Sequence, residues 1–405
     1  EQTLDLFDRM FDIGEPKAID ILLTSLAWEK RGRWEQVLDL YSKAGKTGVT
    51  QSIKHKKIFS VATSACGKVG RWEDALSVLD DMQDIHVAPD EISFNGVISA
   101  CEKSGQWEKA MSLLDQMRQA HLTPSVTSVN SAISACEKGR QWEQAVSLLH
   151  QMNSWGLEPD VIAYNAAISA CAKCGKWRDA LLLLNVMPDV MLMPDVISFS
   201  AATSACDKGR QWHQALSLFG RMQSAIVTPN TLTFSAAISA CRTCRKWERA
   251  LRLFNQMREV NVEQDIQSFN IAISACEEQW EQALSLIADM RARGVSPNVV
   301  SFTAGISACA EGRRWEQAMS LFDKMLKTGI RRDAISYAAI MFACGECGQW
   351  ERCVELLHEM PKVGLTMNAI SLKWSHFTCE ECGQHEQALS LTELHQRWLA
   401  PESRQ

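Results

Sequence analysis

The stretch EISFNGVISACEKSGQWEKAMSLLDQMRQAHLTPS, from Glu91 to Ser125, contains the pattern that decides the fold of this chain. Its tryptophan belongs to a series in which the same interval of 35 residues recurs, broken only by a step of 33 before Trp280: Trp72, Trp107, Trp142, Trp177, Trp212, Trp247, Trp280, Trp315 and Trp350. A fixed period of this size indicates one supersecondary unit that is repeated and buries its apolar face by stacking on its neighbours. We therefore predict an all-α solenoid of stacked helical hairpins, with about 10 repeats.

Each repeat reads as two helices, as the segment Val126–Asp160 illustrates. Its first half has apolar residues at i, i+4 and i+7, which form one stripe of a helix: Val129, Ile133 and Cys136. We expect Gly139 to end this helix in a left-handed conformation. The second half repeats apolar residues every three or four positions: Trp142, Ala145, Leu148, Leu149 and Met152. Gly156 then breaks the second helix, and Pro159 leads into the next repeat.

The repeat frame divides the chain into three regions. Repeats 1 to 10 begin at Lys56, Glu91, Val126, Val161, Val196, Thr231, Ile266, Val299, Ala334 and Ala369. We predict partial and degenerate repeats over 1–55, eight well-formed repeats over 56–333, and degenerate repeats with a cap over 334–405. The segment Glu1–Gly14 reads as the second half of a repeat, so we expect the natural N-terminus to be missing. Repeat 7 is two residues short, and the loss falls between Cys276 and Trp280.

Composition excludes several classes of protein. No run of about 18 apolar residues is present, so we expect no membrane span. The net charge of −6 argues weakly against nucleic acid, whose binding domains tend to be basic. The chain has 15 cysteines, of which ten share one place in the repeat and therefore read as small packing residues. Disulfides are not needed, and the usage fits a reducing compartment.

The repeats resemble those of the pentatricopeptide repeat family. Besides Glu91–Ser125, the segment VIAYNAAISACAKCGKWRDALLLLNVM, which starts at Val161, carries the resemblance. Period, turn glycine, helix-opening Trp, Ala, Met and terminal Pro-Asp all agree over about nine repeats. Tetratricopeptide repeats fit less well, because their period is 34 and their tryptophan lies in the first helix. The resemblance implies a right-handed superhelix that binds single-stranded RNA, with one base per repeat.

By resemblance, the fifth and last residues of a repeat read one base. The candidate reader pairs are Ser60 with Asp90, Asn95 with Ser125, Asn130 with Asp160, Asn165 with Asp195, Ser200 with Asn230, Ser235 with Asp265, Asn270 with Asn298, and Thr303 with Asp333. Short amide and hydroxyl side chains can donate and accept at the edge of a base. The family's pairing rules imply a target near 5′-GCUUAGCG-3′. Alternatively, these side chains only cap or solvate the start of a helix.

The second residue of a repeat is expected to clamp the base. The candidate clamp residues Ile92, Ile162, Ile197, Leu232 and Val300 fit the family, as does Ile335. Three repeats depart from this pattern, with Lys57, Thr127 and Gln267 at the same place. The resemblance therefore does not extend to base stacking in those repeats.

The thirteenth residue of a repeat adds charge to the same helix stripe. Lysine occupies it in repeats 1 to 5: Lys68, Lys103, Lys138, Lys173 and Lys208. These lysines either meet phosphates, the usual source of affinity for nucleic acid, or are ordinary solvated side chains. The stripe later carries Glu311, Glu346 and Glu381, so we hypothesise that the first five repeats hold RNA more tightly. Ala338 and Lys373 cannot read a base as the others do, and recognition should fade after Asp333.

The sequence offers no catalytic constellation. Four CxxC pairs occur, and the last two lie in neighbouring repeats, but packing explains them better than a zinc site does. The H-x-E motif of RNA-editing deaminases is absent. We predict no catalytic residue, metal ligand or cofactor, and we expect that the chain is not an enzyme.

The function predicted from the sequence is therefore sequence-specific binding of single-stranded RNA. Resemblance to the family implies a role in organellar RNA processing, stability or translation, in a mitochondrion or chloroplast. Other RNA-processing proteins are possible partners, whereas a membrane or a small-molecule substrate is not expected. Two alternatives remain: a protein-binding scaffold similar to tetratricopeptide arrays, and the RNA-recognition arm of an enzyme whose catalytic domain lies outside this chain.

Overall fold

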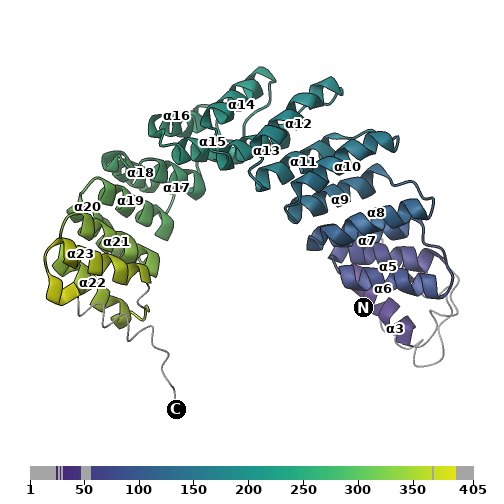
Figure 1. Cartoon of the computed structure of the whole chain (residues 1–405), viewed down its shortest axis with the longest axis horizontal. Coiled ribbons are helices and arrows are strands. Elements are labelled where there is room, and N and C mark those ends of the chain that lie inside the picture. The colour runs from purple at the N-terminus through teal and green to yellow at the C-terminus, as the bar shows by residue number, and fades with distance from the viewer. Residues whose placement is uncertain (1–23, 26–27, 29–30, 47–55, 367–368, 389–405) are drawn as a thin grey trace, which may run out of the picture. The chain divides into compact units, whose positions relative to one another are not determined.

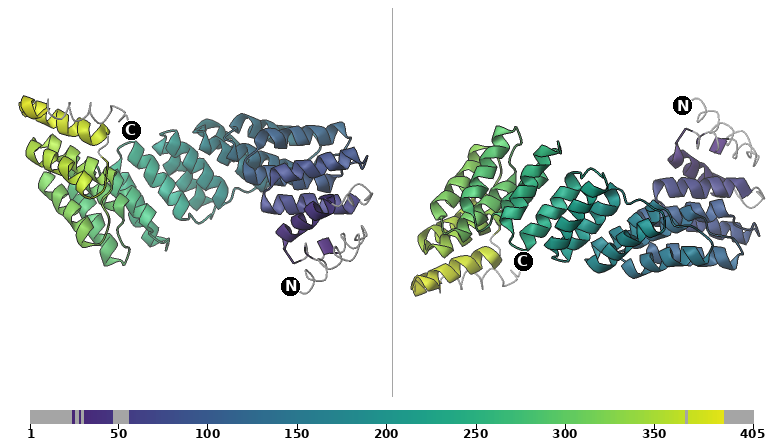
Figure 2. Two further views of the ribbon diagram at one scale, coloured as in Figure 1. Left: turned by 90° about the horizontal axis from the view of Figure 1, so that it is seen from below. Right: turned by 90° about the horizontal axis from the view of Figure 1, so that it is seen from above.

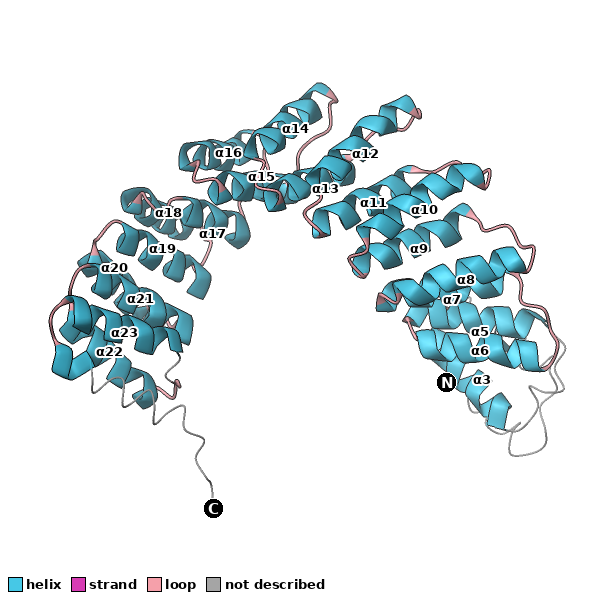
Figure 3. Cartoon of the chain, in the orientation of Figure 1, coloured by secondary structure: helices cyan, strands magenta, loops and turns pink. Residues whose placement is uncertain are grey.

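The computed structural model describes residues 24, 25, 28, 31–46, 56–366 and 369–388. Within these ranges the chain consists of helices joined by short turns, without a strand (Figure 3). It separates into two compact blocks, an N-terminal block, Glu1–Gly209, and a C-terminal block, Arg210–Gln405. The prediction of an all-α array of helical hairpins is confirmed.

The first and second helices of the repeats alternate along the chain (Figure 1). In the N-terminal block the first helices are α5 (Lys56–Val69), α7 (Glu91–Ser104), α9 (Val126–Lys138), α11 (Val161–Lys173) and α13 (Val196–Lys208). Its second helices are α6 (Trp72–Asp84), α8 (Trp107–Gln119), α10 (Trp142–Ser154) and α12 (Trp177–Asp189), preceded by α3 (Trp34–Lys46). As predicted, each tryptophan of the series begins a second helix.

The C-terminal block continues the same alternation. Its first helices are α15 (Thr231–Thr243), α17 (Ile266–Ala275), α19 (Val299–Glu311), α21 (Ala334–Glu346) and α23 (Ala369–Glu381). Its second helices are α14 (Trp212–Ser224), α16 (Trp247–Glu259), α18 (Trp280–Ala292), α20 (Trp315–Lys327) and α22 (Trp350–Lys362). Helix α17 has 10 residues where α15 has 13, so the two-residue loss shortens the first helix. The turn itself is not shortened, because 276–279 separate α17 from α18 whereas only 244–246 separate α15 from α16, and the prediction that the loss falls in the turn is wrong.

Within each block the helices pack in two layers. First helices contact the first helices of the neighbouring repeats, as α7 does with α5 and α9 (Figure 2). A second helix such as α8 packs against its own first helix, α7, and against the next one, α9. The predicted stripe of Val129, Ile133 and Cys136 is fully buried between these layers, as is Ala145. Burying a side chain of the size of valine or isoleucine stabilises a fold by about 1.5–3 kcal/mol, and each repeat contributes several.

The prediction that Gly139 takes a left-handed conformation is wrong. Gly139 has φ −75°, and the left-handed residue is the next one, Arg140, with φ 56°. Glycine is required for another reason, because a Cβ on Gly139 would lie 2.4 Å from Cδ1 of Trp107 in the preceding repeat. The glycine thus makes room for the tryptophan, while the strain falls on the arginine. The other predicted break, Gly156, does have a positive φ of 73°.

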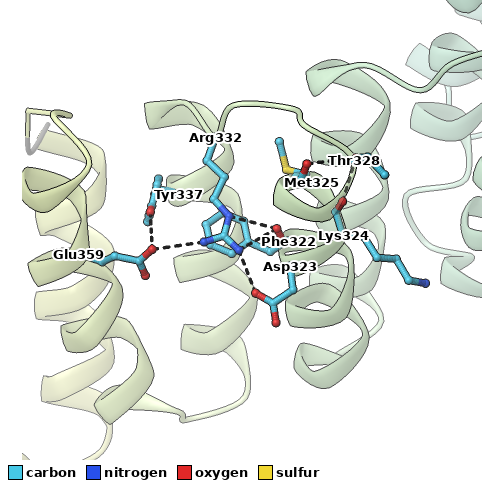
Figure 4. A network of polar contacts seen from close by, with 8 residues as sticks. All are labelled: Phe322, Asp323, Lys324, Met325, Thr328, Arg332, Tyr337 and Glu359. Carbon is cyan, nitrogen blue, oxygen red and sulfur yellow. Dashed lines mark hydrogen bonds and ion pairs between the residues drawn. The ribbon is translucent and has the colours of Figure 1, made fainter.

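In the C-terminal block a buried arginine occupies the place held elsewhere by the repeat's proline (Figure 4). The guanidinium of Arg332 donates to the carbonyl oxygen of Phe322 from Nε at 3.1 Å and from Nη2 at 2.9 Å. It also pairs with Asp323 at 2.9 Å and with Glu359 at 3.3 Å, and it lies 3.8 Å above the Phe322 ring. Tyr337 donates to the same Glu359 at 2.9 Å. This network joins α20, α21 and α22.

The repeated cysteines are core residues, as predicted. Those at the shared place are buried and free, and burial raises the pKa of Cys136 and of Cys206 to about 12. Thiolate is therefore scarce at neutral pH at Cys136 and Cys206, which leaves these two side chains unreactive. Among the described residues, no group of three or more His, Cys, Asp or Glu side chains is arranged to hold a metal ion.

No helix that the structure describes is both long and apolar enough to cross a membrane. The predicted half repeat at Glu1–Gly14 lies outside the described residues.

Candidate nucleic-acid interface

One exposed apolar side chain recurs on the first helices, at the second residue of the repeat. Each clamp residue lies in the first turn of its helix, where nothing in the fold covers it. The exposed fractions are 58% for Ile92, 65% for Ile162, 62% for Ile197, 63% for Leu232, 56% for Val300 and 67% for Ile335. Single exposed apolar residues are ordinary, but the same place exposed in repeat after repeat indicates a surface that binds something.

Reader side chains lie beside these clamp residues and contact each other in pairs. In repeat 3, Nδ2 of Asn130 donates to both carboxylate oxygens of Asp160, at 3.0 and 3.1 Å. In repeat 4, Nδ2 of Asn165 donates to both carboxylate oxygens of Asp195, at 3.1 and 3.3 Å. The fold therefore brings together residues that are 30 positions apart in the sequence.

Three further pairs meet through weaker hydrogen bonds. The Ser60 hydroxyl donates to Asp90 at 3.3 Å. Asn95 donates to Ser125 at 3.4 Å, and Asn270 donates to Asn298 at 3.4 Å. Neither of the residues in any of these pairs crosses from one block to the other, so the geometry of each pair is fixed by direct stacking of neighbouring repeats.

Two predicted pairs, in repeats 8 and 6, show no such bond. In repeat 8 the Thr303 hydroxyl turns back to the carbonyl oxygen of Val299 at 2.8 Å, away from Asp333. In repeat 6 Asp265 caps α17 while Ser235 lies half-buried on α15. Ser200 and Asn230 belong to different blocks, so the pairing of these two residues stays a prediction.

The last residue of each predicted reader pair is the N-cap of the next first helix. Asp160, for example, has an extended backbone, and its Oδ1 accepts from the backbone N–H of Ala163 at 2.8 Å. The capping alternative therefore explains the last residue of a repeat. It does not explain the fifth residue, because Asn130 and Asn165 lie inside their helices and cap nothing.

A groove between repeats 3 and 4 collects these features. It has a volume of about 500 Å³, and it is lined by the readers of repeats 3 and 4, Asn130 and Asn165, and by the clamps of repeats 4 and 5, Ile162 and Ile197, together with Thr127, Glu102 and Glu137. Apolar walls with amide groups between them suit a flat ring whose edge carries hydrogen-bonding atoms. Thr127, where an apolar clamp was absent from the sequence pattern, forms part of the wall.

The carboxylate of Asp90 is ionised at neutral pH. Burial opposes its ionisation, but hydrogen bonds from the backbone and side chain of Ser93 and the charge of Lys56 outweigh this effect, so the pKa of Asp90 lies below its ordinary value. The ammonium of Lys56 lies 3.8 Å from the carboxylate. Asp90 is therefore a charged acceptor beside Ser60, able to bind the N–H groups of a base.

The lysine stripe is less available than its sequence pattern suggested. Lys138 pairs with Glu102 at 3.6 Å, and Lys173 pairs with Glu137 at 3.1 Å, each glutamate belonging to the preceding first helix. Lys103 and Lys208 donate to the backbone oxygens of Lys68 and Lys173. A phosphate would have to replace these contacts, so the phosphate-binding role of the stripe stays a prediction.

Sequence reasoning missed one set of polar residues at this surface. The third residue of a repeat is Ser or Thr in most repeats, and its hydroxyl lies beside the reader pair of the preceding repeat. Ser198 contacts Asn165 and Ser301 contacts Asn270. The signal was present, because a hydroxyl three residues after a capping Asp or Asn predicts a capping box.

Two family models match the chain. One, described as a pentatricopeptide repeat-containing protein, matches residues 59–187. The other, described as the pentacotripeptide-repeat region of PRORP, matches residues 198–372. Together they cover most of the chain, which therefore belongs to the pentatricopeptide repeat proteins.

A solved structure shares this fold. The pentatricopeptide repeat protein PPR10 from maize matches with 20% identity and a TM-score of 0.56, over 92% of this chain and 63% of that chain. Yeast Rmd9p, solved with a 16-nt target RNA, matches with 11% identity and a TM-score of 0.41, over 92% of this chain and 86% of that chain. This chain thus spans less than two thirds of the maize protein. A comparison with curated protein sequences finds no match.

Proposed function

We propose that this chain binds single-stranded RNA and reads one base with each well-formed repeat. The observation that carries the proposal is the pairing of the fifth and last residues beside an exposed apolar clamp, repeated in register along the first helices. The family supports it, because pentatricopeptide repeats are RNA-reading modules. The proposed target is near 5′-GCUUAGCG-3′, which covers repeats 1 to 8.

Binding would need no chemistry beyond contact. A base enters between two clamp residues, such as Ile162 and Ile197, and buries apolar surface on both faces. Its edge then meets the reader pair, Asn165 and Asp195, which offers both donors and acceptors. An array that covers about eight nucleotides in this way can block nucleases or keep a transcript unfolded.

By resemblance to the family, we propose that the bound RNA is an organellar transcript and that binding serves its processing, stability or translation. The compartment follows from the family alone, as a mitochondrion or a chloroplast. Import of the natural protein, followed by fractionation of the cell, tests this part of the proposal. A protein confined to the cytosol would contradict it.

The direct test is fluorescence anisotropy with labelled 5′-GCUUAGCG-3′ at roughly physiological salt, because affinity for RNA depends on salt. A scrambled RNA of the same composition is the control. We expect tighter binding to the proposed target, and we expect Asn130→Ser to shift the preferred third base from U towards G. Binding to neither RNA would favour a protein-binding scaffold, and equal binding to both would contradict the reading rules.

A further inference from the structure

In two repeats the fifth residue is an asparagine whose Oδ1 accepts a hydrogen bond from a hydroxyl, while its Nδ2 contacts the last residue of the repeat. The Ser198 hydroxyl lies 2.5 Å from Oδ1 of Asn165, and it accepts from the backbone N–H of Asp195 at 3.1 Å. The hydroxyl of Ser301 lies 2.5 Å from Oδ1 of Asn270 in the same way. In each case the third residue of one repeat holds the reader amide of the repeat before it.

The other two asparagine readers lack this contact. Oδ1 of Asn95 and Oδ1 of Asn130 are buried and have no hydrogen-bond partner. The third residue behind Asn95 is Ser128, whose hydroxyl donates to the backbone oxygen of Ser125 at 2.8 Å instead. Behind Asn130 stands Ala163, which has no hydroxyl.

We propose that the third residue of a repeat is a positioning residue that sets the selectivity of the preceding repeat for its base. This inference rests on the proposed function. An amide has a donor end and an acceptor end, which exchange places when the group flips by half a turn. A hydroxyl that donates to Oδ1 stabilises one orientation, so that Nδ2 alone is left to meet the reader partner and the base.

The last residue decides how much the hydroxyl matters. Asp195 and Asp160 are carboxylates, which accept from Nδ2 and therefore oppose the flip by themselves. Asn270 is held by Asn298 through one bond of 3.4 Å, so Ser301 supplies most of its orientation. Asn95 faces the hydroxyl of Ser125, which donates or accepts equally well, and repeat 2 should therefore select its base least.

Repeat 7 gives the sharpest loss-of-function test. The ratio of the dissociation constants for RNA with U and with C as the seventh base measures its selectivity. We expect Ser301→Ala to lower this ratio about fivefold, the effect of one lost hydrogen bond, and to leave selectivity at the fourth base unchanged. Ser301→Thr should keep the wild-type ratio, because Thr233 at the same place in repeat 6 donates its hydroxyl to the capping Asn230 at 2.8 Å, as Ser301 does to the capping Asn298 at 3.0 Å.

Repeat 3 gives the matching gain of function. Ala163→Ser places a hydroxyl behind Asn130, so we expect selectivity for U over C at the third base to rise. A variant that only perturbed packing would not gain selectivity. Because the chain already has alanine at this place in Ala163, both substitutions are compatible with the fold, and thermal unfolding of each variant checks this.

The outcomes separate the two proposals. Unchanged ratios in variants that still bind the target would overturn the role of the third residue alone. An equal loss of affinity for every RNA would also overturn it, because that result indicates a structural effect. A wild-type chain that binds none of the RNAs would overturn the proposed function and this inference with it.

Discussion

The second helices and the first helices are parts of the same repeat, yet their regular residues have different causes. In α10 the recurring Ala145, Leu149 and Met152 are buried, so packing explains why they recur. In α11 the recurring Ile162 is 65% exposed, and packing gives no reason for it. Regularity that packing explains belongs to the fold, whereas regularity without a packing reason points to a ligand. Substitutions in the two layers should therefore have separable effects.

The largest effect is expected from the Arg332 network, which joins α20, α21 and α22 in the C-terminal block. Arg332→Ala removes a buried guanidinium together with its hydrogen bonds to the Phe322 carbonyl oxygen and its ion pairs with Asp323 and Glu359, so we expect a loss of about 2–3 kcal/mol in the free energy of unfolding. Urea unfolding followed by circular dichroism measures it. Pro159→Ala at the same repeat place is the control and should cost under about 1 kcal/mol. Equal effects of both substitutions would contradict the role of the network.

A smaller loss is expected in the turn that joins the two layers. Gly139→Ala places a Cβ against Trp107, and the resulting overpacking should cost about 2 kcal/mol. Arg140→Gly removes a strained left-handed residue, and this gain roughly offsets the cost of a flexible glycine, about 0.5–1 kcal/mol. If Gly139 were needed for a positive φ, its neighbour Arg140 would have an ordinary backbone. Here the positive φ belongs to Arg140, so replacing Gly139 should destabilise the fold through overpacking, and replacing Arg140 by glycine should be nearly neutral. Thermal unfolding of the two variants distinguishes them, and a neutral Gly139→Ala would refute this account of the turn.

A change on the face of the first helices should affect RNA and leave stability alone. Ile162→Ser removes an exposed clamp, so we expect stability to change by under about 0.5 kcal/mol while binding weakens by about 1 kcal/mol. Thr127→Ile is the matched gain, because it supplies a clamp where repeat 3 has none. Anisotropy and urea unfolding on the same samples measure both quantities. A clamp variant that unfolds easily yet binds RNA normally would erase the distinction between the layers.

The smallest effect concerns the charges at the ends of the first helices. Lys208→Glu should weaken RNA binding a few-fold and reduce the salt dependence by up to about one phosphate contact. Glu311→Lys, in a later repeat, should change affinity less if the first five repeats bind more tightly. Lys173 is paired with Glu137, so its reversal should cost less than that of Lys208. Changes in affinity of equal size, a loss for Lys208→Glu and a gain for Glu311→Lys, would contradict the hypothesis.

Much of this structure could be predicted from the sequence because a repeat states its pattern many times. The helix that begins at Trp142 and the buried Cys136 followed from spacing alone. The conformation of Gly139 did not, because its reason is the indole of Trp107, 32 positions earlier and in another repeat.

The candidate site shows the same limit. The proximity of Asn130 to Asp160 was expected from the resemblance to the family. The ion pair between Lys138 and Glu102 was not expected, because Glu102 belongs to the preceding first helix and the residues within the helix of Lys138 give no sign of it. Contacts between repeats depend on the offset with which one helix lies on the next, and the sequence period does not state that offset.

The double role of the last residue has a consequence for the design of new specificities. Asp160 both caps α11 and accepts a hydrogen bond from Asn130, so the choice of residue here affects helix stability as well as ligand binding. Loss of such a cap costs about 1 kcal/mol. The last residue of a repeat is therefore limited to residues that can cap a helix, chiefly Asp, Asn, Ser and Thr. Engineered arrays can therefore use only these residues at the last place of a repeat. Each choice will affect the stability of the following helix as well as the preference for a base.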